Sequence, residues 1–462
     1  MNANVPNAPE LPVGPKELST DEIDQLFAPL KSFSRLALAV SGGADSICLL
    51  LLFNDWHSRS GWIGKCEVLT VDHGLRPESA QEAAFVQELS TRFGYTSEKL
   101  TWSGEKPSTG VQETARQVRY RLFAKQMSVS NSEILVLAHH KNDQAETFLD
   151  RLTRGSGVFG LSAMSADERN GPEGLRLMRP LLDVPKARLK DTLKAREQNW
   201  CDDPSNEDHK YKRSRLRNIA GLLEDEGLSQ DRIATTVRQM RRMRTALEFV
   251  LVETFKRLVE EHPAGPARLA VNSFQTLPEE IRLRLLIMAI ERVTGGAVSP
   301  RLKKLETLDQ IILSAQKVRQ TFGGAVLERD DSLLWIWKEA GRCSPKTLVD
   351  VSGKGTWDNR FLYEATLPDT GSNEMGTITL GPLKDSPIIR RKLGVVEGWP
   401  KDAFSCSPVF WINDKVVSTE VFSSLKYAGE QIESPVVKLT RIPFLPDLAG
   451  NYSNDLVTET KV

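Results

Sequence analysis

Residues 41–46, with the sequence SGGADS, gather glycines, hydroxyls and a carboxylate at one turn of the chain. An apolar run ends at Val40, and another begins directly after Ser46. This order predicts a strand, a tight turn and the start of a helix, a geometry that points backbone N–H groups at a bound anion. The two adjacent glycines let the backbone approach that anion closely. We therefore expect phosphate to be held by Ser41, Gly42, Gly43, Ala44, Asp45 and Ser46.

The carboxylate of Asp45 indicates that a cation accompanies the phosphate. The loop lacks the lysine of a Walker motif, and a carboxylate beside polyphosphate is repulsive unless a cation lies between them. Mg²⁺ prefers carboxylate and phosphate oxygens as ligands, so we expect Asp45 to bind Mg²⁺ together with the phosphates. The missing lysine favours cleavage between the α and β phosphates. The alternative is an ordinary strand–helix turn in which Asp45 only places negative charge at the helix N-terminus.

Between residues 33 and 155, expected strands alternate with expected helices, and these elements could position the loop. Expected strands cover residues 36–40, 67–71, 98–101 and 134–138, and expected helices cover residues 46–57, 78–93 and 112–127. Such alternation predicts a parallel sheet with helices on both faces. Ligands of these sheets bind beyond the carboxyl ends of the strands. Polar residues follow three of the expected strands: Ser41, then Asp72 with His73, then His139 with His140.

The stretch HHKNDQAETFLDRLTR could bind an amino-acid substrate. Asp143, Glu146 and Asp150 recur at i, i+3 and i+7, which places them on one face of a helix. Carboxylates there could hold an ammonium group through charge-assisted hydrogen bonds. The alternative is a solvated helix face whose acids favour the positive N-terminal end. His139 and His140 could hydrogen-bond ATP or substrate, whereas adjacent histidines point in different directions and disfavour a metal site.

These residues carry a resemblance to known enzymes. The loop resembles the SGGxDS loop of the PP-loop (N-type) ATP pyrophosphatases, which adenylate a carbonyl-type oxygen and release pyrophosphate. Over roughly residues 33–220 the chain resembles the tRNA(Ile)-lysidine synthase family. The stretches that carry this resemblance are VDHGLRPESAQEAAFV (71–86), ETARQVRY (113–120), LAHHKNDQAETFLDRLTRGSGVFGLSAM (137–164), RPLLDVPKARL (179–189) and WCDDPSNEDHKYKRSRLR (200–217). One departure is Asn142, where the family commonly has a second aspartate.

The resemblance implies a ligase that forms a carbon–nitrogen bond. ATP adenylates the C2 oxygen of the wobble cytidine in a CAU-anticodon isoleucine tRNA, and the ε-amine of free lysine then attacks C2 and expels AMP. Codon specificity changes from AUG to AUA. Catalysis is expected of Asp45, Asp143 and Glu146, with His139 or His140 assisting, and Asp72 and His73 are expected near the nucleotide.

Basic clusters could hold the RNA although the chain has zero net charge. Arg116 and Arg119 share a helix face with Glu113, where a surface ion pair is the alternative. Residues 232–244 contain five arginines and no acid, and residues 388–394 form a third, shorter patch; either could instead be a solvated face. The strongest cluster, at residues 209–218, comprises Lys210, Lys212, Arg213, Arg215 and Arg217.

Composition is that of a globular protein, with 40% hydrophobic and 26% charged residues. No apolar stretch is long enough to span a bilayer, and the first fifteen residues carry four prolines and no basic segment of a signal peptide. Five cysteines without CxxC spacing argue against a disulfide framework, a zinc ribbon or a redox pair. We expect a cytoplasmic protein with no membrane partner, and the sequence does not indicate its oligomeric state.

A length of 462 residues predicts more than one domain. We expect a disordered or extended tail at residues 1–30, the α/β PP-loop catalytic domain at 31–215, a helical tRNA-binding domain at 216–318 and a smaller α+β domain at 319–462. Other interpretations stay open at this point. One is another PP-loop tRNA-modifying enzyme, of the 2-thiocytidine type, although sulfur transfer usually needs CxxC cysteines. The second is a non-catalytic RNA-binding relic, which the intact loop disfavours.

Overall fold

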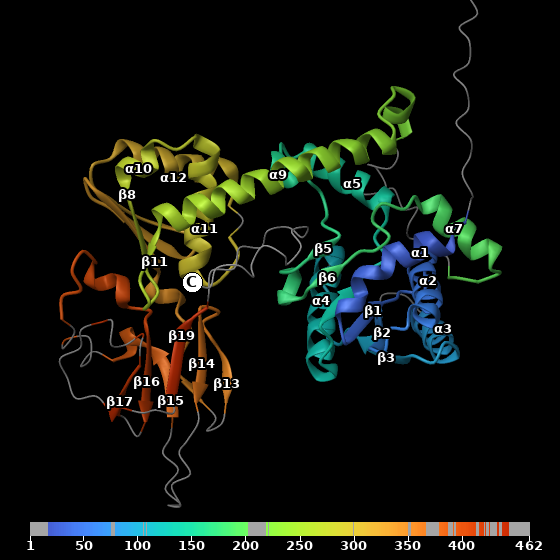
Figure 1. Cartoon of the computed structure of the whole chain (residues 1–462), viewed down its shortest axis with the longest axis horizontal. Coiled ribbons are helices and arrows are strands. Elements are labelled where there is room, and N and C mark those ends of the chain that lie inside the picture. The colour runs from blue at the N-terminus through green and yellow to red at the C-terminus, as the bar shows by residue number, and fades with distance from the viewer. Residues whose placement is uncertain are drawn as a thin grey trace, which may run out of the picture. The chain divides into compact units, whose positions relative to one another are not determined.

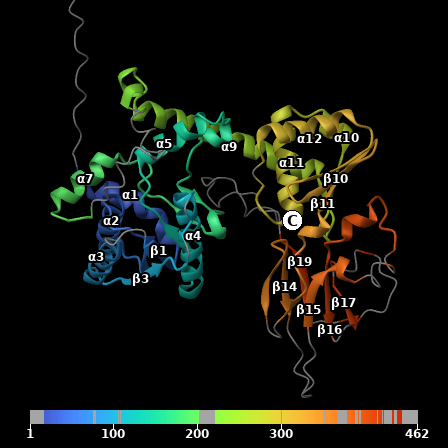
Figure 2. The same cartoon turned by 180° about the vertical axis from the view of Figure 1, so that it is seen from behind.

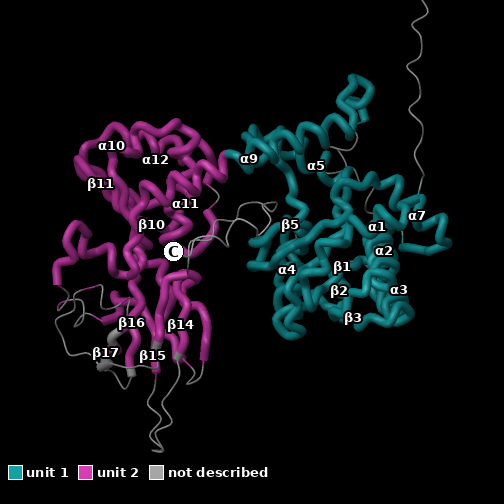
Figure 3. Tube along the Cα trace, in the orientation of Figure 1, with its two compact units in different colours: residues 1–246, 447–462 teal, residues 247–446 magenta. Residues whose placement is uncertain are grey.

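The computed structural model describes residues 17–442 except 75–78, 105, 108, 202–218, 220, 299, 350–352, 366–377, 387–390, 392–393, 413–414, 420, 422–424, 426–431 and 434–436. The chain forms two compact units, divided between Ala246 and Leu247 (Figure 3). This division falls inside the long helix α9 (Gln230–Leu258). The structure therefore draws its boundary within the segment 216–318 that we expected to form one helical domain.

The first unit is built on a six-stranded sheet in the order β3-β2-β1-β4-β6-β5 (Figure 1). All neighbouring pairs are parallel except the edge pair of β5 and β6, which is antiparallel. The expected parallel sheet is confirmed. Its strands are β1 (Arg35–Ala39), β2 (Lys65–Asp72), β3 (Thr96–Thr101), β4 (Ile134–Val136), β5 (Asp167–Glu168) and β6 (Leu177–Met178).

Helices cover both faces of this sheet, as Figures 1 and 2 show from opposite sides. Leu36 and Leu38 of β1 point to one face, where they pack in a common core with α1, α2, α3 and α7. Ala37 points to the other face and packs with Tyr120 and Phe123 of α4. The helices are α1 (Thr20–Phe27), α2 (Ala44–Ser60), α3 (Ser79–Arg92), α4 (Val111–Ser130), α5 (Lys141–Leu152), α6 (Val158–Leu161) and α7 (Lys186–Ala195).

The strand order reverses between β1 and β4. Connections after β1 lead outward to β2 and β3, whereas β4 lies on the opposite side of β1. The turns that follow β1 and β4 therefore diverge, and such a switch point opens a crevice at the carboxyl ends of the strands. The first of these turns is the loop 41–46, and the second contains His139 and His140.

The N-terminal part of α9 belongs to the first unit because it packs on α5. Ile233 and Val237 lie in one apolar cluster with Ala145, Phe148 and Leu149 of α5. The four-residue spacing of Ile233 and Val237 puts both on the same helix face, whereas Arg232, Arg238 and Arg242 are exposed. An acidic helix and a basic helix thus share a small core.

The second unit combines helices with three small sheets, ordered β7-β8-β11-β10-β9, β12-β15-β16-β17-β18 and β13-β14-β19. Hydrogen bonds between β8 and β11 cross the expected domain border at 318/319. No helix in the described part of the chain is both long and apolar enough to cross a membrane. The elements are β7 (Glu260–Glu261), β8 (Ala267–Ala270), α10 (Val271–Gln275), α11 (Glu279–Thr294), α12 (Leu302–Ser314), β9 (Val318–Phe322), β10 (Ala325–Arg329), β11 (Leu333–Lys338), β12 (Thr347–Leu348), β13 (Lys354–Trp357), β14 (Phe361–Ala365), β15 (Ile378–Pro382), β16 (Pro408–Ile412), β17 (Lys415–Ser418), β18 (Ile432–Glu433) and β19 (Val437–Arg441).

A disulfide in the second unit corrects the expectation from cysteine spacing. Cys343 and Cys406 are 63 residues apart in the sequence, yet their Cα atoms lie 5.6 Å apart and their sulfurs are bonded. Short-range CxxC rules cannot detect such a pair, because the fold alone brings the two turns together. Cys48, Cys66 and Cys201 form no disulfide bond.

Candidate active site

The loop between β1 and α2 is shaped to bind an anion. Gly42 has a φ of +91°, which side chains rarely tolerate, and a Cβ there would also contact Glu82 at 3.6 Å. Ser46 Oγ donates to the Gly43 carbonyl at 2.9 Å and accepts from the Ser41 N–H at 3.1 Å, which closes the turn on itself. Gly43 caps α2 without a side-chain hydrogen bond, so the first N–H groups of the helix point outward, available to phosphate.

Asp45 stands in the first turn of α2 between two nitrogen groups. Its Oδ2 lies 3.3 Å from Nε2 of His140 and 3.2 Å from Nζ of Lys186. Burial disfavours the charged carboxylate, but the hydrogen bond and charge of His140, together with the Lys186 ammonium, outweigh burial and hold the pKa of Asp45 below its usual range. Asp45 is therefore an anion at neutral pH.

The other carboxylate oxygen of Asp45, Oδ1, is suited to bind the expected Mg²⁺ ion. Oδ1 is buried and has no hydrogen-bond partner in the described part of the chain. No group of three or more possible metal ligands occurs among the described residues. A single carboxylate is consistent with Mg²⁺, which takes one or two protein carboxylates and completes its shell with phosphate oxygens and water.

His140 connects Asp45 to the acidic helix. The residue is the N-cap of α5, and its side chain is 2% exposed. Nδ1 accepts from the Asp143 N–H at 3.4 Å, and the Asp143 carboxylate accepts from the His140 N–H at 2.9 Å, which forms a reciprocal capping box. Nε2 thus faces Asp45, while Nδ1 faces the first turn of α5. A chain of contacts therefore runs from Asp45 through His140 to Asp143.

The carboxylates expected on α5 have different surroundings. Asp143 is engaged in the helix cap, and Glu146 is only 7% exposed, which sets it apart from a solvated surface acid. Asp150 pairs with Arg154 at 2.8 Å, four residues on, in a surface contact of small energetic value. Because Glu146 faces inward on the helix that contacts the phosphate loop, it is the best-placed carboxylate for a bound cationic substrate. His139 is half-buried beside His140.

Lys186, which the sequence did not single out, lies at this site, and so does Asn142, which the sequence marked only as a departure from the family pattern. Lys186, at the start of α7, supplies an ammonium next to the loop and so replaces the lysine that the loop itself lacks. Asn142 accepts a hydrogen bond from the Lys186 N–H at 3.1 Å through its Oδ1, and thereby fixes the first turn of α7. The RPLLDVPKARL stretch contained Lys186, but nothing in its local spacing indicated that the fold would bring it to Asp45.

Asp72 is the last residue of β2 and His73 follows it, and β2 lies on the side of β1 opposite β4. Asp72 shapes its own turn, since Oδ1 accepts from Ser79 Oγ at 2.7 Å and from the Gly74 N–H at 2.8 Å, and these bonds keep the pKa of Asp72 low. His73 presents a buried Nδ1 without a hydrogen-bond partner in the described structure. Burial and the charge of nearby Arg119 lower the pKa of His73, which keeps its ring neutral at pH 7.

The residues expected to bind tRNA are only partly described. Arg116 and Arg119 both lie over the ring of Tyr120, with guanidinium carbons 5.2 and 5.6 Å from the ring centre. The basic cluster of Lys210, Lys212, Arg213, Arg215 and Arg217 lies outside the described residues.

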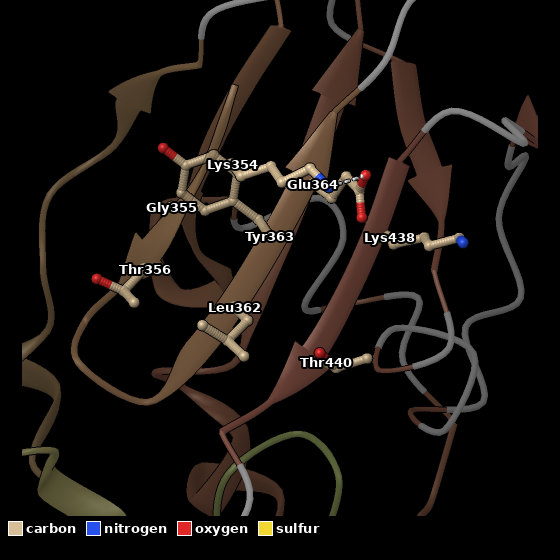
Figure 4. A pocket seen from close by; sticks show the side chains of 8 residues that line it. All are labelled: Lys354, Gly355, Thr356, Leu362, Tyr363, Glu364, Lys438 and Thr440. Carbon is tan, nitrogen blue, oxygen red and sulfur yellow. Dashed lines mark ion pairs between the residues drawn. The ribbon is translucent and has the colours of Figure 1, made fainter. Parts of the chain in front are cut away.

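A separate hollow of about 470 Å³ lies on the β13-β14-β19 sheet of the second unit (Figure 4). Its most prominent polar feature is an ion pair between Lys354 and Glu364 at 2.6 Å, with Lys438 on the neighbouring strand. None of the site residues expected from the sequence lines this hollow.

The fold, the glycine turn and its aspartate define a PP-loop ATP-binding protein, and the family model described as a PP-loop domain matches residues 15–222. The chain is 39% identical to the tRNA(Ile)-lysidine synthase of a Bradyrhizobium species over 71% of its length and 94% of that protein. It is 34% identical to the enzyme of the same name from Wolbachia pipientis over 84% of its length and 89% of that protein. The chain belongs to the tRNA(Ile)-lysidine synthase family.

Among solved structures, a U34-tRNA thiolase from Methanococcus maripaludis, which carries a [4Fe-4S] cluster, matches with a TM-score of 0.40 and 15% identity. The match covers 48% of this chain and 78% of that one. Similarity at this level carries no argument about function.

Proposed function

We propose that this protein ligates lysine to the wobble cytidine of a CAU-anticodon isoleucine tRNA at the expense of ATP. The observation that carries the proposal is the contact chain from the phosphate loop through Asp45 and His140 to the acidic helix α5. These contacts connect the ATP site at the loop with a binding site for the lysine ammonium on α5, on the two sides of one crevice. A ligase needs both sites within reach of the same base.

The first step joins the cytidine C2 oxygen to the α phosphorus of ATP and releases pyrophosphate. The outward N–H groups at the start of α2 and the Lys186 ammonium bind the phosphates. Asp45 Oδ1 would hold Mg²⁺, which would supply positive charge to offset the negative charge of the phosphates. His140 holds Asp45 in its ionised form throughout, because its Nε2–H points at Oδ2.

In the second step the lysine ε-amine attacks C2, the C2–O bond breaks, AMP leaves and the amine loses its proton. Glu146 and Asp143 on α5 bind the ammonium of the incoming lysine and so orient its side chain. Arg116, Arg119, the basic cluster at residues 209–218 and the exposed arginines of residues 232–244 bind the tRNA backbone. The reaction takes place in the cytoplasm, where tRNA is found.

The experiment is incorporation of labelled lysine into purified CAU-anticodon isoleucine tRNA with ATP and Mg²⁺. A methionine tRNA with the same anticodon and a Glu146→Ala variant run in parallel. Incorporation into the isoleucine tRNA alone, lost in the variant, supports the proposal. ATP–pyrophosphate exchange without lysine transfer points to another nucleophile, such as the sulfur of a thiolase. RNA binding without either signal leaves a non-catalytic protein and refutes the proposal.

A further inference from the structure

The segment between α5 and β5, residues 157–165, is held in place by arginines on its backbone. Apart from the short helix α6 it has no regular structure, and Ala163 adopts a positive φ of 52°. Guanidinium groups from α5, α9 and the end of β6 donate to its carbonyl oxygens: Arg151 to Gly160 and Ala163 at 2.7 and 3.0 Å, Arg241 to Met164 at 2.9 Å, and Arg179 to Ser165 at 2.7 Å. The side chains of three separate elements therefore fix this segment.

Met164 is hydrogen-bonded to both the acidic helix α5 and the basic helix α9. Its carbonyl oxygen accepts from Gln144 Nε2 of α5 and from Arg241 of α9, each at 2.9 Å. Its N–H donates to Gln144 Oε1, also at 2.9 Å, so both backbone groups of Met164 bind one α5 side chain. Gln144 directly follows Asp143 and is itself 3% exposed. The Met164 carbonyl oxygen therefore links Arg241 of α9 to the residue that follows Asp143 on α5.

The arginines of α9 fall into two groups. Arg238 and Arg242 are exposed on the helix, whereas Arg241 and Arg244 are half-buried. Arg244 lies over the ring of Phe159 at 5.6 Å and within 3.5 Å of Ser162 Oγ. Burial lowers the pKa of Arg241, which shows that its charge has been taken out of water at a cost. A guanidinium placed to meet a solvent-side phosphate would not need to be buried.

We propose that Arg241 and Arg244 are positioning residues, which transmit RNA binding on the exposed face of α9 to the carboxylates of α5 through residues 157–165. The inference rests on the proposed function. Exposed arginines such as Arg238 bind the phosphate backbone and set affinity. The buried pair holds residues 157–165 against Gln144, so that α5 is in its reactive position only while α9 is correctly seated.

The matched variants are Arg241→Met and Arg238→Met, which remove one guanidinium each from the same helix. Arg241→Met lowers kcat for lysine transfer about 10- to 100-fold with an unchanged KM for tRNA, because a misplaced binding group costs rate and leaves remote contacts intact. Arg238→Met raises the KM for tRNA, more steeply at high salt, since it removes a phosphate contact. Arg241→Lys, which keeps a donor for the Met164 oxygen, restores part of kcat. Equal KM effects in both variants, with kcat unchanged, would overturn the inference.

Hydrogen exchange gives a readout that does not depend on lysine transfer. Saturating CAU-anticodon isoleucine tRNA slows amide exchange in residues 157–165 and 140–146 of the wild-type protein and of Arg238→Met. The same RNA has no effect on those peptides in Arg241→Met, although the variant melts cooperatively and binds RNA. RNA-dependent protection that survives in Arg241→Met refutes the coupling. A wild-type protein that shows the protection but transfers no lysine refutes the proposed function alone.

Discussion

Replacing Lys186 by methionine tests the electrostatics of the phosphate loop. The Lys186 ammonium lies 3.2 Å from Asp45, and the two side chains are 34% and 30% exposed. At this exposure solvent screening leaves a stabilisation of about 1 kcal/mol, well below the several kcal/mol that Coulomb's law gives for an unscreened pair. We therefore expect Lys186→Met to unfold about 2–4 °C below the wild type.

The pH dependence of this difference follows from the lowered pKa of Asp45. A carboxyl group whose pKa is lower in the folded state stabilises the fold above its unfolded pKa, here 3.8, and loses that contribution as the pH falls below it. The stability gap between Lys186→Met and the wild type is therefore complete at pH 7 and narrows as the pH falls through 3.8. Urea denaturation at a series of pH values measures it, and a gap that stays constant into acid contradicts the assignment.

Lys186→Met also removes the ammonium group that binds the phosphates of ATP in the proposed function. A charge-assisted hydrogen bond of about 1.5–3 kcal/mol corresponds to about 10- to 100-fold in rate, so tRNA-dependent ATP–pyrophosphate exchange falls by that factor. The control is Lys194→Met, which makes the same charge change at an exposed position of the same helix. An equal loss in the control, or wild-type exchange in Lys186→Met, refutes the reasoning.

Three further changes have expected outcomes. Glu146→Gln raises the KM for lysine about 10- to 100-fold, because it removes a charge-assisted hydrogen bond to the substrate, and it leaves ATP–pyrophosphate exchange intact. Loss of this exchange in the variant would place Glu146 in the first step instead. Asn142→Ala removes the acceptor of the Lys186 N–H and lowers the free energy of unfolding by about 1 kcal/mol, as other lost helix caps do; an unchanged urea midpoint would contradict this. Cys343→Ala destabilises the second unit by about 2–4 kcal/mol, because the disulfide to Cys406 is lost. Dithiothreitol destabilises the wild type but has no additional effect on this variant.

The sheet could be predicted from the sequence because buried parallel strands are continuous apolar runs. The run at 36–40 became β1 (Arg35–Ala39), and the run at 67–71 became β2 (Lys65–Asp72). The run at 134–138 became β4 (Ile134–Val136). Each pattern is local, and each strand formed within a few residues of its expected bounds.

What could not be predicted depends on contacts between distant residues. Lys186 reaches Asp45 across 141 positions of sequence, and no periodicity records such a contact. The two-residue strands β5 and β6 are too short to produce a pattern. The arginines of α9 looked uniform in sequence, and only the packing of Ile233 and Val237 on α5 decides which of them are buried.

A unit boundary inside a helix has a practical consequence for fragments of this protein. A chain cut before α9 would expose Ala145, Phe148 and Leu149, which Ile233 and Val237 otherwise cover, and would leave Met164 without its arginine donor. A catalytic fragment should therefore extend through Ala246, although the last strand of the nucleotide-binding sheet, β6, ends at Met178. For the same reason, a chimera that exchanges the second unit must keep the residues of α9 up to Ala246.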